Sequence, residues 1–161
     1  MYIATFVLSE PSASEFVRIQ PIGAEQSASL SGNDYPATDA LDNSVDTFSA
    51  SLPIGSDLWI KFTLEEVRCV HQVMVYLYID VEGFVYHTTT FTCDQDGCTC
   101  DGESCEMQSL EVTGAVGGSS NCKNGDALML SSTVAGLESH IIISEIAVYA
   151  TRRKKNLRFN L

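Results

Sequence analysis

The clearest hydrophobic pattern in the chain is a strict alternation over residues 58–64, LWIKFTL. A strand at this point would place every second residue, all of them apolar, on one face: Leu58, Ile60, Phe62 and Leu64. The next run, residues 67–81, is rich in β-branched and aromatic residues and ends before the turn signal Glu82-Gly83. We expect these two runs to form an antiparallel pair of strands.

Further short runs of strand composition follow, each bounded by Gly, Ser or Asn. They cover residues 84–92, 107–114, 126–133 and 140–151, and residues 15–22 predict an edge strand in which Pro21 is tolerated. No segment keeps a 3.6-residue apolar period for more than two turns. Many short strands without a helical layer predict an all-β fold, a jelly-roll β-sandwich.

Two segments between these strands, residues 32–56 and 93–106, are expected to be long irregular loops of functional importance or held by covalent bonds. The glycine-rich segment 114–126 is expected to be a turn, because it lacks the Lys-Ser or Lys-Thr pair of a phosphate-binding loop. Residues 94–102 are similar to the opening of an EF-hand loop, but position twelve is Cys105 and no helices flank it.

The charge of the chain argues against some partners. With 21 acidic and 9 basic residues, the formal net charge is −12, which disfavours a nucleic-acid or anionic-membrane partner. Five of the nine basic residues lie in the last ten positions, between Arg152 and Arg158. No apolar span precedes this basic tail, so a solvated tail is favoured over a membrane contact. The sequence does not predict an oligomeric state.

Six cysteines suggest an oxidising compartment. They are Cys69, Cys93, Cys98, Cys100, Cys105 and Cys122. The central C-x4-C-x-C-x4-C spacing does not match the knuckles of structural zinc sites, so disulfides are favoured over metal. Six cysteines allow about fifteen pairings, and the connectivity stays open. We therefore expect a secreted or cell-surface protein. Because the N-terminal apolar run is too short to span a bilayer, we expect that a signal has been removed or that the chain is a fragment.

A candidate cation site combines two distant stretches. Residues 39–51, DALDNSVDTFSAS, hold three aspartates, an asparagine and several hydroxyl residues on a segment too polar for a buried element. Calcium requires six to eight oxygen ligands in a flexible shell. We hypothesise that Asp42 and Glu145 are the charged ligands of one structural Ca²⁺ that joins an early loop to the last strand. The alternative is a solvated acidic turn and a glutamate on the surface of an edge strand.

Several short motifs resemble one family. They are QSASLSG (26–32), DALDN (39–43), SAS (49–51), DLWIKFTL (57–64), VHQVMVYL (70–77) and SEIAVY (144–149). Together they resemble the F-type (fucose-binding) lectins and the related discoidin-like, coagulation-factor type C domains of the galactose-binding-like superfamily. The resemblance implies a jelly-roll domain over residues 24–150, after an N-terminal segment 1–23 with a possible edge strand and before a basic tail 151–161.

The resemblance also implies a set of calcium ligands. These would be the carbonyls of Asp39 and Ser44, the carboxylate of Asp42, a hydroxyl or carbonyl at Ser49 or Ser51, the carbonyl of Ser144 and the carboxylate of Glu145. Asn43 stands where the family usually has glycine, and asparagine tolerates a positive φ better than most residues. The turn is therefore expected to form.

The sugar site of the family is only partly retained. The loop 51–57 lacks the expected histidine, Tyr78 stands where an arginine is usual, and only Asp80 is kept. High-affinity fucose binding is therefore not expected. Relatives of the discoidin type use varied loop tips, and the corresponding candidates are Leu52, Pro53, Ile54, Tyr78, Asp80, Glu82, Phe84 and Tyr86. An aromatic ring beside a carboxylate suits weak sugar binding, whereas the alternative is that Tyr78 and Phe84 pack within the sheet.

The sequence thus predicts an extracellular, calcium-stabilised recognition module that is not an enzyme. Lectin-like binding of a glycan or cell-surface glycoprotein is the first hypothesis. The second is a cell-adhesion or matrix module that binds protein through its loop tips. A hydrolase is not supported, because no G-x-S-x-G elbow occurs and His71, His87 and His140 are scattered over predicted strands.

Overall fold

The computed structural model describes residues 15–27, 35–44, 47–51, 58–80, 84–101, 108–132 and 141–153. Within these ranges the chain forms nine strands and one short 3₁₀ helix. The elements are β1 (Phe16–Ile19), β2 (Gly23–Gln26), η2 (Ala37–Leu41), β3 (Ser49–Ser51), β4 (Trp59–Asp80), β5 (Phe84–Asp94), β6 (Gly97–Asp101), β7 (Gln108–Ser119), β8 (Cys122–Ser132) and β9 (Ile141–Thr151). No helix of the described residues is long and apolar enough to cross a membrane.

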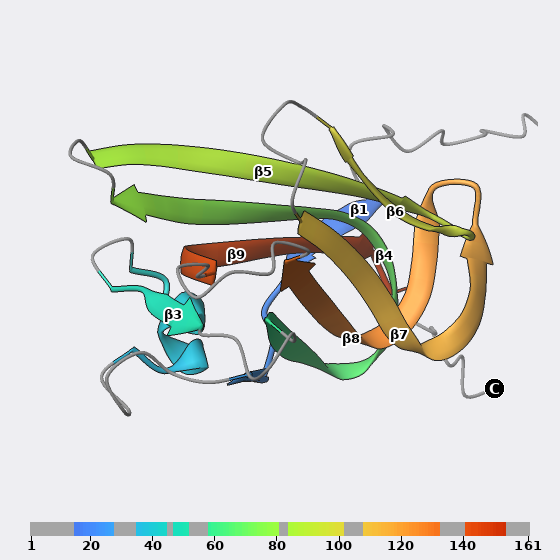
Figure 1. The fold of residues 1–161 in the computed structure, drawn as a ribbon. Helices are drawn as coiled ribbons and strands as arrows, with labels where there is room; N and C mark the ends of the chain where they lie inside the picture. The colour runs from blue at the N-terminus through green and yellow to red at the C-terminus, as the bar shows by residue number, and fades with distance from the viewer. Residues whose placement is uncertain are drawn as a thin grey trace, which may run out of the picture.

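The long strand β4 is the centre of the fold (Figure 1). Its first half pairs with β2 and β8, and its second half pairs with β5 and β9, all antiparallel. The pairing with β8 shifts in register between Thr63 and Arg68, where β4 bends. A sheet that bends in this way curls over its own apolar face, as expected for a β-sandwich.

The expected hairpin between residues 58–64 and 67–81 is wrong. Both runs belong to the single strand β4, because the residues between them, Leu64 to Val67, include no turn-forming Gly, Pro, Asn or Asp. The chain passes through an irregularity in the ladder and continues in the extended conformation. The alternating pattern predicted the strand correctly, but not its length.

The predicted buried face of residues 58–64 is confirmed. Ile60 and Phe62 are fully buried, and Leu58 and Leu64 are each 3% exposed. They pack in one apolar cluster with residues of the other strands, including Leu128 and Leu130 of β8, Ile146 and Val148 of β9, and Phe91 of β5. Each such side chain contributes roughly 1.5–3 kcal/mol on burial. This core holds the two halves of the folded sheet together.

The strands expected at 15–22, 84–92, 107–114, 126–133 and 140–151 are present as β1, β5, β7, β8 and β9. Three short strands were missed: β2, β3 and β6. The expected irregular loop 93–106 is wrong in its first part, because β6 returns from β5 as a hairpin that pairs Cys93 with Cys98. Each missed strand has five residues or fewer, which is too short for a clear alternation.

The glycine-rich segment 114–126 is not an extended turn. It continues β7 and β8 almost to their junction, and the turn itself is confined to Ser120-Asn121. Gly114, Gly117 and Gly118 all have positive φ, a region that residues with a Cβ rarely adopt. The glycines therefore allow strongly twisted strands to continue where a polar, glycine-rich sequence suggested a loop.

Disulfides are confirmed over metal for the cysteines that the structure describes. Cys69 of β4 is bonded to Cys122 of β8, and Cys93 of β5 is bonded to Cys98 of β6. Cys100 is also disulfide-bonded, and Cys105 lies outside the described residues. The first bond links strands that already pair in the sheet, so it secures the end of the β-sandwich at which β9 also finishes.

Candidate functional site

The polar segment 39–44 forms a short 3₁₀ helix and a tight turn. Pro36 precedes η2, and Ala37 and Ala40 bury their methyl groups against the core. At the end of η2, Asp42 folds its carboxylate over the following turn: Oδ1 accepts from the Ser44 amide at 2.9 Å, and Oδ2 accepts from the Thr47 hydroxyl. Asn43 has φ = 59°, as its tolerance of the left-handed region predicted.

Glu145 lies on β9 with an unusual environment for a carboxylate. It is only 5% exposed, and within the described structure neither carboxylate oxygen has a hydrogen-bond partner. The register between β4 and β9 shifts at this point, since Tyr76 faces Glu145 and Leu77 faces Ile143, so Ser144 is the extra residue of a bulge. Bulges re-aim neighbouring side chains. A buried, unpaired carboxylate costs several kcal/mol unless something compensates its charge.

The electrostatics link Glu145 to the turn after η2. Burial raises the pKa of Glu145, and the nearby carboxylate of Asp42 raises it further, while the amides of Ile146 and Asn43 and the Arg18 guanidinium lower it. Neither amide reaches a hydrogen-bonding geometry with the carboxylate. Burial, and then the charge of Asp42, also raise the pKa of Asp39. The turn at Asp42-Asn43 and the last strand, far apart in sequence, therefore meet at one place.

The serines expected near the ion hold the surrounding backbone together. The Ser49 hydroxyl is 3.4 Å from the Ile143 carbonyl oxygen, and the Ser144 hydroxyl is 3.2 Å from that of Tyr76, each as donor. Ser44 uses its amide toward Asp42, and Ser51 is described only by its backbone, which pairs with Ile141. The hydroxyls of Ser49 and Ser144 are thus engaged with carbonyls of the adjacent strands.

The donor set suits a hard cation more than a transition metal. In the part of the chain that the structure describes, no three His, Cys, Asp or Glu side chains are grouped to hold a metal. A cation beside Glu145 would therefore take most ligands from carbonyl and hydroxyl oxygens, as calcium does. The unpaired oxygens of Glu145 are the observation that favours such an ion, because they need a positive partner.

The candidate recognition residues are only partly described. Leu52, Pro53, Ile54 and Glu82 lie outside the described residues, and Tyr78, Asp80, Phe84 and Tyr86 are described by their backbone alone. The register pairs Tyr78 with Tyr86 and Asp80 with Phe84 at the tip of the β4–β5 ribbon. These four candidate residues are therefore cross-strand neighbours at the ribbon tip.

The strand pairing brings this tip and the segment after β3 to the same end of the molecule. β3 runs antiparallel to β9 and ends at Ser51 opposite Ile141, the first residue of β9. β4 also runs antiparallel to β9 and passes Ile143 at Leu77, just before the tip. Both segments thus leave the sheet at the beginning of β9 (Figure 1). Glu145 lies two residues further along β9 than Ile143, beneath this end.

One neighbour of the site was not predicted. Arg18 of β1 acts on Glu145 because β1 pairs with β9, with Arg18 opposite Tyr149. No local signal around residue 18 indicates this proximity, since it depends on a pairing between the two ends of the chain. Arg18 supplies part of the positive charge near Glu145, but it makes no ion pair with it among the described contacts.

Comparisons with known proteins concern the fold. No protein-family model matches the chain, and no curated protein is similar to it in sequence. A fucolectin from striped bass (Morone saxatilis) serum superposes with a TM-score of 0.51 at 13% identity, covering 91% of this chain and 49% of that one.

Two further solved structures have lower TM-scores. A carbohydrate-binding module (CBM32) of AlyQ, in complex with 4,5-unsaturated mannuronic acid, has a TM-score of 0.48 at 13% identity, covering 82% of this chain and 97% of that one. The chitosan-binding module 1 from a chitosanase/glucanase of Paenibacillus sp. IK-5 has a TM-score of 0.46 at 17% identity, covering 80% and 95%. At these identities the likeness concerns the fold alone. The chain shares its all-β, β-sandwich fold with the striped bass fucolectin.

Proposed function

We propose that this protein is an extracellular recognition module of lectin type, without catalytic activity, which binds a glycan through the loop tips at the beginning of β9. A structural Ca²⁺ stabilises that end of the molecule. The observation that carries the proposal is the buried carboxylate of Glu145, which lies beside the turn of Asp42 and Asn43 and has no hydrogen-bond partner among the residues that the structure describes. A bound cation would neutralise this charge and fix η2 to β9 below the recognition loops.

The calcium ligands in this proposal are those that the sequence suggested. Glu145 would supply the charged ligand from β9, and Asp42 the second one from the turn. The Asp42 carboxylate accepts hydrogen bonds from the Ser44 amide and the Thr47 hydroxyl. Each of its oxygens keeps a further lone pair that could bind a cation. Carbonyl oxygens of Asp39, Ser44 and Ser144, with a hydroxyl or carbonyl oxygen of Ser49 or Ser51, would complete the shell. Calcium accommodates such an irregular set of oxygens, whereas magnesium requires a regular octahedron.

The glycan site in this proposal is formed at the tip of the β4–β5 ribbon. Pairing of Tyr78 with Tyr86 and of Asp80 with Phe84 supplies three aromatic residues and one carboxylate in adjacent positions. Aromatic faces stack on sugars, and a carboxylate accepts hydrogen bonds from sugar hydroxyls. The fold likeness to a fucolectin supports a glycan as ligand, and the missing histidine and arginine argue for a sugar other than fucose.

An oxidising compartment is consistent with the disulfides of β4–β8 and β5–β6. Extracellular calcium is near a millimolar in many fluids, so that even a weak site would be filled there. Localisation, calcium binding and glycan binding are thus parts of one proposal.

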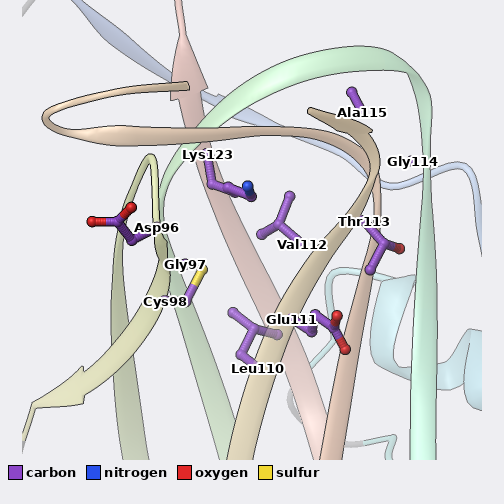
Figure 2. Close-up of a pocket in the computed structure, with 10 residues that line it drawn as sticks. All are labelled: Asp96, Gly97, Cys98, Leu110, Glu111, Val112, Thr113, Gly114, Ala115 and Lys123. Atoms are coloured by element: carbon purple, nitrogen blue, oxygen red, sulfur yellow. The ribbon is translucent and has the colours of Figure 1, made fainter. Parts of the chain in front are cut away.

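Glycan-array binding in the presence of calcium tests the recognition role. The chain is compared with Asp80→Ala, which removes the carboxylate at the ribbon tip, and with Glu111→Ala as matched control. Glu111 is an exposed carboxylate on β7 (Figure 2), and among the described residues β7 does not pair with β4 or β5. We expect signals on a limited set of glycans that Asp80→Ala loses and Glu111→Ala keeps. Equal absence of binding for all three proteins would contradict the lectin role and favour binding of protein through the same loops.

A further inference from the structure

The long ribbon of β5 and the second half of β4 has one face that the core does not use (Figure 1). Side chains along a strand alternate between its two faces. On the inner face, Val73, Val75 and Phe91 are at most 1% exposed and belong to the core. The outer face carries three cross-strand pairs, which we call the ribbon strip: Gln72 with Thr92, Met74 with Thr90, and Tyr76 with Thr88. Thr88 is exposed and the other five side chains are partly exposed, so the strip is accessible.

The ribbon strip runs directly into the proposed glycan site. The pairing of β4 with β5 keeps one register from Gln72 to Asp80. The pairs of Tyr78 with Tyr86 and of Asp80 with Phe84 therefore occupy register positions on the same face as the strip. From residue 72 to residue 80 the ribbon is about 27 Å long, at about 3.4 Å per residue. A single terminal sugar at the tip would cover only part of this length.

The chemistry of the ribbon strip suits uncharged sugars. None of its six side chains is charged, and five of them offer hydrogen-bonding groups: three threonine hydroxyls, one phenol hydroxyl and one amide. Between them, the ring of Tyr76 and the thioether of Met74 supply apolar surface for the C–H groups of a sugar ring. An acidic polysaccharide would instead meet a chain with a formal net charge of −12. The strip therefore matches a neutral glycan.

We propose that the ligand of this protein is a neutral, linear glycan that lies along the ribbon strip, with one end at the ribbon tip. This inference rests on the proposed glycan-binding function and adds the length and charge of the ligand to it. The backbone of Tyr76 is held in place, because its carbonyl accepts a hydrogen bond of 3.2 Å from the Ser144 hydroxyl. Tyr76 also pairs with Glu145, so the proposed calcium ion would fix β9 beside the strip.

Isothermal titration calorimetry with calcium present tests the length of the ligand. The probes are neutral oligosaccharides of one to six units: the cello, manno and N-acetylated chito series. Each further ring seated on the ribbon strip adds contacts, so in a series that binds we expect the hexasaccharide to bind about tenfold or more tightly than the monosaccharide.

A pair of matched variants tests the position of the ligand. Thr88→Arg places a long charged side chain on the exposed part of the ribbon strip. We expect it to reduce hexasaccharide affinity to the level of the monosaccharide. Thr63→Arg is the control, because Thr63 is exposed in the first half of β4, where β4 pairs with β2 and β8. This variant should keep the full dependence of affinity on length.

Three outcomes would overturn the inference and leave the proposed function standing. Equal affinity of the unmodified protein for monosaccharide and hexasaccharide means that only the tip binds sugar. A length dependence that Thr88→Arg does not change means that the glycan runs over another surface. Length-dependent binding of oligogalacturonate or chitosan alone means that the ligand is charged. Absence of binding to these series and to every glycan of the array would instead contradict the proposed function, and the inference with it.

Discussion

Replacement of Glu145 by glutamine separates the cost of its buried charge from its use as a ligand. The side chain is 5% exposed, and both oxygens lack partners within the described structure. Without calcium, Glu145→Gln removes a charge that burial disfavours while it keeps the shape of the side chain. We therefore expect the variant to be more stable than the unmodified protein in EDTA. With calcium the order reverses, because the amide cannot replace an ionised ligand.

The size of both effects follows from the site. Leaving a buried polar group unsatisfied costs about 1–3 kcal/mol, and an unpaired charge costs more, so relief by glutamine should be at least about 1 kcal/mol. Binding at a hundredfold excess of calcium over its Kd adds about 2.7 kcal/mol to the unmodified protein. In a domain of this size, 1 kcal/mol shifts Tm by about 2–4 °C, so calcium should raise Tm by about 5–10 °C.

Thermal unfolding followed by circular dichroism measures this, with each protein in EDTA and in millimolar calcium. The matched control is Glu111→Gln, an exposed glutamate whose replacement should leave both Tm values nearly unchanged. If calcium raised Tm equally in the unmodified protein and in Glu145→Gln, the carboxylate would not be a ligand. If Glu145→Gln lowered Tm in EDTA, the buried charge would be compensated by something other than a cation, and the reasoning from its unpaired oxygens would fail.

Three further predictions concern pH, disulfides and one glycine. Burial raises the pKa of Glu145 from its ordinary 4.5, so in EDTA its contribution to stability improves as pH falls from above the raised pKa toward 4.5; the calcium-induced rise in Tm should shrink over that same range. Replacing both cysteines of Cys69–Cys122, 53 residues apart, should cost about 4 kcal/mol in urea unfolding, against about 2 kcal/mol for Cys93–Cys98, 5 apart; equal costs would contradict the loop-entropy argument. Gly118→Ala should destabilise the folded protein by about 1–3 kcal/mol, because Gly118 has φ = 158° and an added Cβ would clash with the Cys122 carbonyl oxygen. Gly23→Ala should change stability little, because the space around Gly23 is open.

The sequence by itself determined the fold class and much of the core. Alternation at residues 58–64 identified Ile60 and Phe62 as buried because a strand exposes its two faces in turn, a property of the local backbone. The preference of cysteine clusters for disulfides likewise follows from spacing alone. Asn43 was expected to permit a positive φ, and this too depends only on the residue and its own backbone.

Only the tertiary structure decided what depends on contacts between distant residues. The union of two predicted strands into β4 follows from pairing with four other strands, and no local signal records those partners. The short strands β2, β3 and β6 exist because longer neighbours supply hydrogen bonds to them. The local sequence around Glu145 does not show whether this side chain lies on the surface or in the interior. Its burial, its unpaired oxygens and its proximity to Asp42 arise because β9 pairs with β1, β3 and β4 at once, and long-range pairing of this kind is set by the packing of the whole chain.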